Sequence, residues 1–204
     1  MIKNIVFDFG DVFINLDKKA PEQALAKMGI RHIDEEMTTW HNTYEKGLIT
    51  STQLTENYLK KFPSLTALSF KQAWNSIILD FPQHRLDWIM LLAKDKSYRL
   101  FLLSNTNDLH IEQVIKNMGA LRYSQFQNCF ERFYLSQKIN MRKPDLEIYD
   151  HVLQNDTLIA EETLFIDDTL LNTAAAASMG IHTWHLEPGV QDVTQLFEVK
   201  KDLF

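Results

Sequence analysis

The chain has 204 residues, of which 45% are hydrophobic and 24% charged, as in folded globular proteins and unlike disordered or fibrous ones. It carries 21 basic and 27 acidic residues, a net charge of −6 with no basic cluster, which argues against a nucleic-acid partner. No apolar run approaches the ~20 residues of a membrane helix, no signal peptide is evident, and the single Cys129 excludes an internal disulfide, so we expect one core with at most a modest insertion, in a reducing cytoplasm.

The first predicted element is a buried strand that ends in an aspartate. Ile5, Val6 and Phe7 are apolar in succession, which indicates a strand covered on both faces, and Asp8 follows directly. Ligands of open α/β sheets bind outside the carboxyl ends of such strands. Asp8 is therefore suited either to chemistry or to capping the next turn, where aspartate is also common.

Residues 15–85 have apolar residues at helical spacing and no strand-like run. We expect four helices there: residues 20–28 before Gly29, residues 34–46 before Gly47, a third capped by Ser51 or Thr52 and running to Lys61, and a fourth capped by Ser69 and ending before Pro82. Because core elements flank the segment on both sides, we predict a helical cap at 15–85, inserted in a core made of residues 1–14 and 86–204.

From residue 86 onward, predicted helices and strands alternate. The predicted strands are 99–103, 130–135, 163–166 and 181–186, and the predicted helices are 86–94, 109–118, 144–154 and 174–179. The segment 130–135 is amphipathic, which indicates a position near the sheet edge. Strands joined by helices predict parallel order with right-handed crossovers, so the fold class is α/β with a mostly parallel sheet.

Polar residues follow three of the buried strands. Asp8 follows the first, Ser104 and Asn105 stand at the end of the second, and Asp167 and Asp168 follow the third. Because the carboxyl ends of parallel strands meet at one edge, we expect these side chains in one crevice. Carboxylates so close repel one another unless a cation neutralises them, and oxygen ligands suit Mg²⁺. The alternative for the paired aspartates is a helix cap with a solvated neighbour.

Lys143 is a further candidate because it precedes a predicted helix. Pro144 suits the first helical position, and the acidic Asp145 and Glu147 suit the first turn. A lysine beside the free N–H groups of a helix amino terminus can bind a phosphate. Taken alone, however, a Lys-Pro pair before a helix is more often a surface turn.

Together, these stretches resemble the four motifs of the haloacid dehalogenase-like hydrolases, in order and in spacing. They are Phe7-Asp8-Phe9-Gly10, Leu103-Ser104-Asn105-Thr106, Arg142-Lys143-Pro144, and Phe165-Ile166-Asp167-Asp168 with Asn172. Within this superfamily the chain is most similar to the bacterial α-D-glucose-1-phosphate phosphatases. The resemblance implies a three-layer Rossmann-like core with a small cap, and a Mg²⁺-dependent phosphatase of small phosphorylated metabolites. Among these it favours a hexose phosphate such as glucose 1-phosphate.

The resemblance also implies catalytic and phosphate-binding roles. Asp8 would be the nucleophile that takes the phosphoryl group as an aspartyl phosphate. Ser104 and the backbone N–H of Asn105 would hold the phosphoryl oxygens. Lys143 would balance the charge of both the phosphate and Asp8, so that catalysis is largely electrostatic.

A metal site is implied at the same edge of the sheet. Mg²⁺ would bind Asp8, the backbone carbonyl of Gly10, and Asp168. Asp167 belongs to the same metal site in this interpretation, and it would order the surroundings of the ion together with Asn172.

Gly10 departs from the family pattern, in which this position usually holds a second aspartate that protonates the leaving oxygen. General acid–base assistance is typically worth ~10²–10⁴-fold, so another proton source or a good leaving group is expected. Asp11 is one candidate, although strand alternation requires a turn just after Phe9 to aim it inward. His41, His110 and water entering from the cap are others.

Two other functions are compatible with the sequence. A 2-haloacid dehalogenase-type hydrolase also uses an aspartate nucleophile without a second aspartate, but it does not need the metal that Asp167 and Asp168 imply. A phosphate-binding or regulatory protein with little turnover would keep the pocket without the acid. The predicted cap would select the substrate: Trp40, His41, Tyr44 and Glu45 share helical turns, although core packing of the two aromatic residues is the simpler interpretation.

Overall fold

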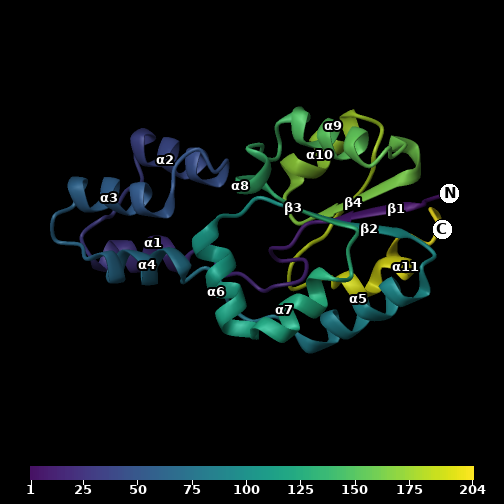
Figure 1. The fold of residues 1–204 in the computed structure, drawn as a ribbon, viewed down its shortest axis with the longest axis horizontal. Helices are drawn as coiled ribbons and strands as arrows, with labels where there is room; N and C mark the ends of the chain where they lie inside the picture. Colours follow the sequence, from purple (N-terminus) through teal and green to yellow (C-terminus); the bar gives the residue numbers. More distant parts are fainter.

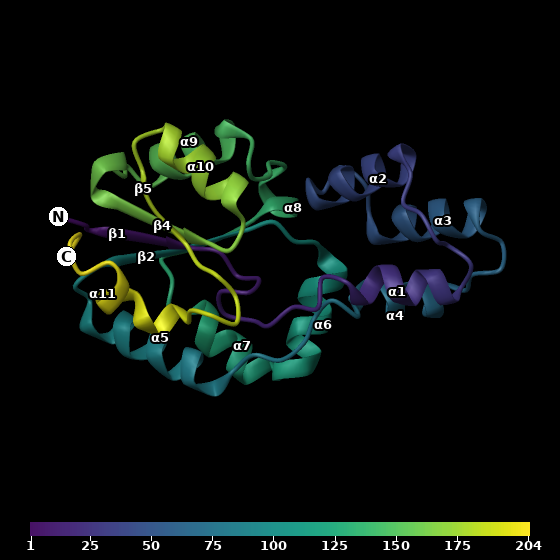
Figure 2. The ribbon, with the colours of Figure 1, turned by 180° about the vertical axis from the view of Figure 1, so that it is seen from behind.

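The structure, a computed structural model that describes residues 1–204, consists of an α/β core and four helices that project from one end of it (Figure 1). The view from behind in Figure 2 has the same two parts, with both chain termini at the opposite end of the core. None of the helices is at once long enough and apolar enough to cross a membrane.

Five parallel strands form the central sheet, in the order β3-β2-β1-β4-β5. Their bounds are β1 Asn4–Phe7, β2 Arg99–Ser104, β3 Arg132–Leu135, β4 Thr163–Asp167 and β5 His182–His185. The predicted α/β class with a mostly parallel sheet is therefore confirmed, and the amphipathic strand β3 does lie at an edge. Because β2 and β4 both pair with β1, their carboxyl ends lie on either side of Asp8.

Helices cover both faces of the sheet, giving three layers (Figures 1 and 2). One face carries α5 Gln83–Asp95, α6 Asp108–Met118, α7 Ala120–Gln127 and α11 Leu196–Val199, and the other carries α9 Leu146–Asn155 and α10 Leu170–Ser178. Side chains of β1 alternate between two apolar clusters: Ile5 and Phe7 join the cluster with α5, and Val6 joins the cluster with α9. Burial of both clusters fixes the register of the strands, and this register determines where the polar residues at their carboxyl ends lie relative to one another.

The projecting part has its own apolar core, built from Leu54, Tyr58, Phe70 and other buried side chains. Its helices are α1 Ala20–Lys27, α2 Glu35–Glu45, α3 Ser51–Lys61 and α4 Ala67–Asn75.

Two predicted helix caps in this part were wrong by one and three positions. Thr50 caps α3, and Thr66 caps α4, each in a capping box with the residue three positions later. Thr50 and Thr66 have extended backbones, which direct the hydroxyl oxygen at the first free N–H groups of the helix, whereas Ser51 and Ser69 already lie within the helices.

Two neighbouring chain segments connect the projecting helices to the core. The N–H groups of Asn15 and Asp17 donate to the carbonyls of Asp80 and Ile77, at 2.9 Å each, and the N–H of Leu79 donates back to Asn15 at 3.1 Å. Leu16 and Ile78 form an antiparallel bridge between these bonds. The outgoing and returning chains therefore run as a short two-stranded connection.

The region around Lys143 differs from the prediction. Helix α9 begins at Leu146, so Pro144 lies outside the helix and Lys143 is not at its amino terminus. The side chain of Asn105 binds the backbone of Lys143 instead, accepting from its N–H at 2.9 Å and donating to its carbonyl at 2.8 Å. This reciprocal pair anchors Lys143 to the loop after β2. Helix α7, which follows Gly119 directly, was not predicted at all.

Candidate active site

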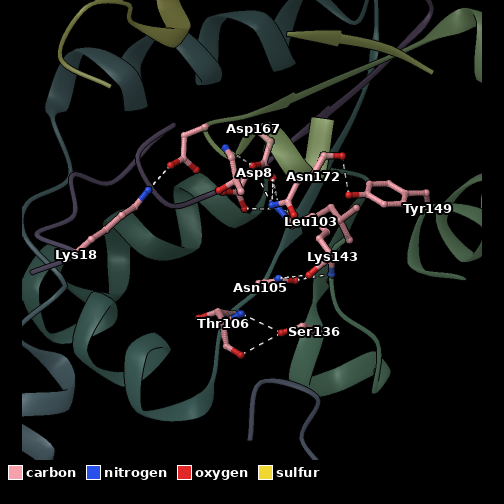
Figure 3. A network of polar contacts seen from close by, with 12 residues as sticks. Asp8, Lys18, Leu103, Asn105, Thr106, Ser136, Lys143, Tyr149, Asp167 and Asn172 are labelled. Atoms are coloured by element: carbon pink, nitrogen blue, oxygen red, sulfur yellow. Dashed lines mark hydrogen bonds and ion pairs between the residues drawn. The ribbon is translucent and has the colours of Figure 1, made fainter. Parts of the chain in front are cut away.

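The ends of β1, β2 and β4 meet at a cavity of about 420 Å³, here called the strand-end cavity. Asp8, Gly10, Asn105, Lys143 and Asp168 are among its lining residues. Figure 3 shows Asp8, Asp167, Lys143 and Asn172 converging at this point. The expectation that polar strand ends gather in one crevice therefore agrees with the geometry.

Lys143 is the centre of the polar network. Its ammonium nitrogen lies 2.7 Å from Asp8 Oδ1, 2.6 Å from Asp167 Oδ2 and 2.8 Å from the carbonyl oxygen of Leu103. These three acceptors use all three N–H donors of the ammonium group, and the residue is 1% exposed. Burial opposes the charge, but the carboxylates of Asp167 and Asp8 outweigh it and raise the pKa of Lys143 above its usual value.

Asp167 is fully occupied by donors from the protein. Its two oxygens accept from the Lys143 ammonium, from the N–H of Thr169 at 2.8 Å, and twice from the Asn172 amide at 3.0 Å. Asn172 is itself held by Tyr149, whose hydroxyl donates to the Asn172 carbonyl at 2.9 Å (Figure 3). This arrangement fixes Asp167 as the group that orients Lys143.

Asp8 retains more freedom, because its Oδ2 accepts no hydrogen bond from the protein. Burial raises its pKa to about 7, against the lowering effect of Lys143, and Asp167 and Asp168 raise it further. Carboxylate oxygens of Asp8, Asp167 and Asp168 all lie within 4.8 Å of one another. The pKa of Asp8 is therefore raised mainly by burial, and the lowering effect of Lys143 does not fully offset it.

Lys18, which no sequence pattern indicates, is the second cation of the site. Its ammonium contacts Asp168 and lies 3.1 Å from Asp11 Oδ2. Asp168 is 150 positions away in the chain, and no local pattern around Lys18 indicates the contact. The backbone of Asp168 is also held, because His185 Nε2 lies 3.0 Å from its carbonyl oxygen.

Ser104 and Asn105 provide donors that the protein leaves unused. Ser104 is 3% exposed, yet its hydroxyl makes no hydrogen bond and is not among the fully enclosed atoms that lack a partner, so a ligand can reach it. The backbone N–H groups of Asn105, Phe9 and Gly10 likewise take part in no hydrogen bond. Gly10 and Asn105 line the strand-end cavity, so their N–H groups are candidates for ligand contacts.

The chain turns immediately after Phe9, as an inward-facing Asp11 would require, since Asp11 has a left-handed backbone with φ of 53°. However, Asp11 Oδ1 accepts from the N–H of Leu16 at 2.9 Å, Oδ2 pairs with Lys18, and the residue does not line the strand-end cavity. Asp11 therefore holds the turn and Lys18 in place. It does not take the position of the missing acid.

The two candidate histidines lie together beside a second cavity. Burial lowers the pKa of both His41 and His110 to about 4, so both rings are neutral at pH 7. This second cavity, of about 440 Å³, is called the inter-helix cavity, and it shares Lys18 and Glu45 with the strand-end cavity. Glu45 reaches the boundary from α2 and pairs through Oε2 with Arg142, at 2.9 Å.

Comparisons with known proteins agree with this arrangement. The family model described as haloacid dehalogenase-like hydrolase matches residues 5–185. A D-ribitol-5-phosphate phosphatase from Bacteroides thetaiotaomicron is 31% identical over 199 residues, which cover 93% of this chain and 94% of the relative.

Solved structures resemble the whole chain. A HAD family enzyme from the same organism, in complex with magnesium and inorganic phosphate, has a TM-score of 0.84 at 33% identity, covering 97% of this chain and 100% of that one. A HAD-like family hydrolase from Porphyromonas gingivalis has a TM-score of 0.81 at 27% identity, covering 100% and 98%. The similarity therefore includes the projecting helices as well as the core.

Proposed function

The chain belongs to the haloacid dehalogenase-like hydrolase family and is a phosphatase within it, and we propose that Asp8 accepts the phosphoryl group of a small phosphorylated metabolite, with Mg²⁺ as cofactor. The observation that carries this proposal is the contact of the buried Lys143 ammonium with Asp8 and Asp167. A fixed cation beside a carboxylate with a free oxygen suits phosphoryl transfer, because its catalysis is mostly positioning and charge stabilisation.

The atoms that suit Mg²⁺ are the free oxygen of Asp8, the carboxylate of Asp168 and the carbonyl of Gly10. All are oxygen donors, as this ion prefers, and the carboxylates lie close enough to share one ion. Burial is the main cause of the raised pKa of Asp8, and Asp167 and Asp168 add to it, so an added cation at this point would favour the ionised carboxylate. When bound, Mg²⁺ supplies positive charge near the phosphoryl oxygens. Asp167 would support this site by holding Lys143, with Asn172 behind it.

The reaction would proceed in two displacements at phosphorus. The Asp8 carboxylate forms a bond to phosphorus through the oxygen that would not hold the ion, while the ester oxygen leaves and takes a proton from water to become the free alcohol. Water then attacks phosphorus, which releases inorganic phosphate and restores the carboxylate. The Ser104 hydroxyl and the N–H of Asn105 would bind the phosphoryl oxygens through both steps. Lys143, whose three donors face Asp8, Asp167 and the Leu103 carbonyl, would offset the charge of the phosphoryl group through space and would keep Asp8 ionised.

Sugar phosphates and sugar-alcohol phosphates are the proposed substrates. The relative from B. thetaiotaomicron is a D-ribitol-5-phosphate phosphatase, and a hexose phosphate such as glucose 1-phosphate remains within the same class. The cluster of Asp8, Asp167 and Asp168 does not support the alternative of a dehalogenase, because dehalogenation needs no metal ion. We also propose that residues 15–85 act as the cap, because α2 brings Glu45 to the edge of the strand-end cavity.

The test is phosphate release from a panel of sugar and sugar-alcohol phosphates, with Mg²⁺ and with EDTA. We expect turnover that needs the metal and that falls at least ~10³-fold in Asp8→Asn, because the nucleophile is lost. Asp202→Asn, at an exposed carboxylate near the carboxyl end of the chain, is the matched control and should keep full activity. Turnover that ignores EDTA, or that survives Asp8→Asn, would contradict the mechanism. Phosphate binding without turnover of any substrate would favour a binding or regulatory protein instead.

A further inference from the structure

One polar face of α2 lines the inter-helix cavity. Thr38, His41 and Glu45 lie on it at spacings of three and four residues. Polar lining from other segments comes from Lys18, Glu22 and His110. Glu45 also lines the strand-end cavity, so the two cavities adjoin at this side chain. This face of α2 is therefore the part of the cap next to a group attached to a phosphate in the strand-end cavity.

The apolar part of the lining comes from Leu25, Ile33, Trp74 and Ile77. The ring of Trp74 contacts both histidines, since His41 meets it edge-on at 4.9 Å between centroids and His110 stacks on it at 5.6 Å. A ligand in this cavity thus meets both hydrogen-bonding groups and carbon surfaces.

His41 presents a hydrogen-bond donor to the cavity because a buried tyrosine sets its tautomer. Its Nε2 lies 2.6 Å from the hydroxyl of Tyr58, which is completely buried and has no other partner. Burial raises the pKa of Tyr58 far above its usual value, so the hydroxyl keeps its proton and must donate it to Nε2. The proton of the neutral imidazole is then on Nδ1. That nitrogen has no protein partner and is not enclosed, so its N–H is available to a ligand.

His110 lines the same cavity but has no such donor. The side-chain oxygen of Asn107 accepts from the backbone N–H of His110 and from Trp74 Nε1, which leaves the side-chain nitrogen of Asn107 to donate to His110 Nδ1 at 3.0 Å. His110 Nε2 therefore carries the proton and donates it to the Trp74 carbonyl at 3.2 Å. Both ring nitrogens are used within the protein, so His41 alone of the two offers a free one.

Acceptors complete the polar face of α2. Arg142 Nε donates to Glu45 Oε2 at 3.0 Å, and Arg142 Nη2 lies 2.9 Å from the same oxygen, so Oε1 has no protein partner. Thr38 donates its proton to the Asp34 carbonyl at 3.0 Å, which leaves its hydroxyl oxygen as an acceptor. His41 thus offers a donor between two acceptors, Thr38 and Glu45, along one face of α2. This order suits a chain of hydroxyl groups, because each hydroxyl group can both donate and accept a hydrogen bond.

We propose that the inter-helix cavity binds the polyhydroxylated carbon chain of the substrate, with His41 Nδ1–H and Glu45 Oε1 as the groups that distinguish it from a plain alkyl ester. This inference rests on the proposed phosphatase function and adds its specificity residues. The C–H groups of the chain pack against Ile33 and Ile77, and a deoxygenated chain leaves His41 and Glu45 without hydrogen-bond partners from the ligand, which penalises it.

The test compares two phosphate esters of equal carbon number, D-ribitol 5-phosphate and n-pentyl phosphate, by phosphate release. We expect the wild-type ratio of their kcat/KM values to favour the hydroxylated ester, and His41→Phe, which keeps an aromatic ring against Trp74, to lower that ratio about 10- to 100-fold. His41→Asn, whose amide nitrogen can stand near the position of Nδ1, should recover part of the ratio. His32→Phe, on an exposed cap histidine outside the cavity, is the control and should leave the ratio unchanged.

Several outcomes separate this inference from the proposed function. Failure of the wild type to hydrolyse either ester would count against the phosphatase itself. Asp8-dependent hydrolysis of both esters without preference, or an unchanged ratio in His41→Phe, would overturn only the specificity assignment. Imidazole ¹⁵N chemical shifts give a second readout: they should report a neutral Nδ1–H tautomer for His41 in the wild type and loss of that preference in Tyr58→Phe. An Nε2–H tautomer in the wild type would also overturn the assignment.

Discussion

Replacement of Lys143 by methionine removes the cation of the site without leaving a large hole. Asp167 is then an ionised carboxylate with no exposed surface, and Asp8, 8% exposed, loses its only protein donor. Breaking a buried ion pair in this way costs about 3–5 kcal/mol. For a chain of this size ~1 kcal/mol corresponds to ~2–4 °C, so we expect Lys143→Met to melt roughly 6–20 °C below the wild type at neutral pH. Activity should be lost as well, because the pKa of Asp8 rises further and its carboxylate becomes protonated.

The assays are thermal unfolding and phosphate release, with Lys138→Met as the matched control. Lys138 is a solvent-exposed lysine that pairs with Asp108 at 2.8 Å, so its removal should cost no more than about 1 kcal/mol. The double variant Lys143→Met/Asp167→Asn removes one unpaired charge and should regain part of the stability but none of the activity. The reasoning is refuted if Lys143→Met unfolds at the same temperature as Lys138→Met, or if the double variant is less stable than Lys143→Met alone.

Three further predictions concern the same site. Because the folded-state pKa of Asp8 is raised to about 7, the metal-free protein should lose stability between about pH 4 and pH 7 as the pH rises. Calorimetry should find that Mg²⁺ stabilises the protein more at pH 8 than at pH 5. Equal stabilisation at both pH values would argue against an ionised Asp8 as metal ligand. Asn105→Ala releases the backbone of Lys143 and should lower kcat at least ~10-fold with a smaller effect on melting temperature, whereas the exposed control Asn117→Ala should leave kcat unchanged. Gly10→Asp restores the usual acid, and its Cβ would approach only the tip of Leu16, at 2.7 Å. The double variant Gly10→Asp/Leu16→Ala should therefore exceed Leu16→Ala in kcat on alkyl phosphates but gain little on p-nitrophenyl phosphate, whose leaving group needs no proton. Equal gains on both substrates would refute a role of the new aspartate as acid.

Much of the strand-end cavity was predictable because it depends on local patterns that the sheet then assembles. Runs such as Ile5 to Phe7 identify buried strands, and parallel order alone brings Asp8, Ser104 and Asp167 to one edge. The prediction needed no knowledge of the helices that cover the sheet. The fold class follows from the same alternation.

Contacts between distant segments could not be predicted in this way. Lys18 reaches Asp168, and Arg142 reaches Glu45, only because the projecting helices rest against the core in one particular orientation. Pro144 predicts a helix terminus at Lys143, but the side chain of Asn105 forms hydrogen bonds with the backbone N–H and carbonyl of Lys143 instead. Helix propensity is a weak signal where a side chain offers the backbone a better partner.

The expectation that Asp11 supplies the missing acid was wrong for a similar reason. The turn after Phe9 exists, yet both carboxylate oxygens of Asp11 are taken by the N–H of Leu16 and by Lys18. Sequence indicates which residue types are near a strand end. It does not indicate which of their oxygens remain free.

The two-stranded connection between residues 15–17 and 77–80 makes the projecting helices separable from the core. Leu16 and Ile78 are bridge partners, and such partners have Cα atoms ~4.5–5.5 Å apart, a gap that a two-residue hairpin loop spans. Excision of residues 17–77 and closure with an Asn-Gly turn would therefore leave the five-stranded sheet and its connections intact. The same join would accept a helical segment from a relative, so new substrate preferences can arise by exchange of one contiguous block of sequence while Asp8 and Lys143 stay unchanged.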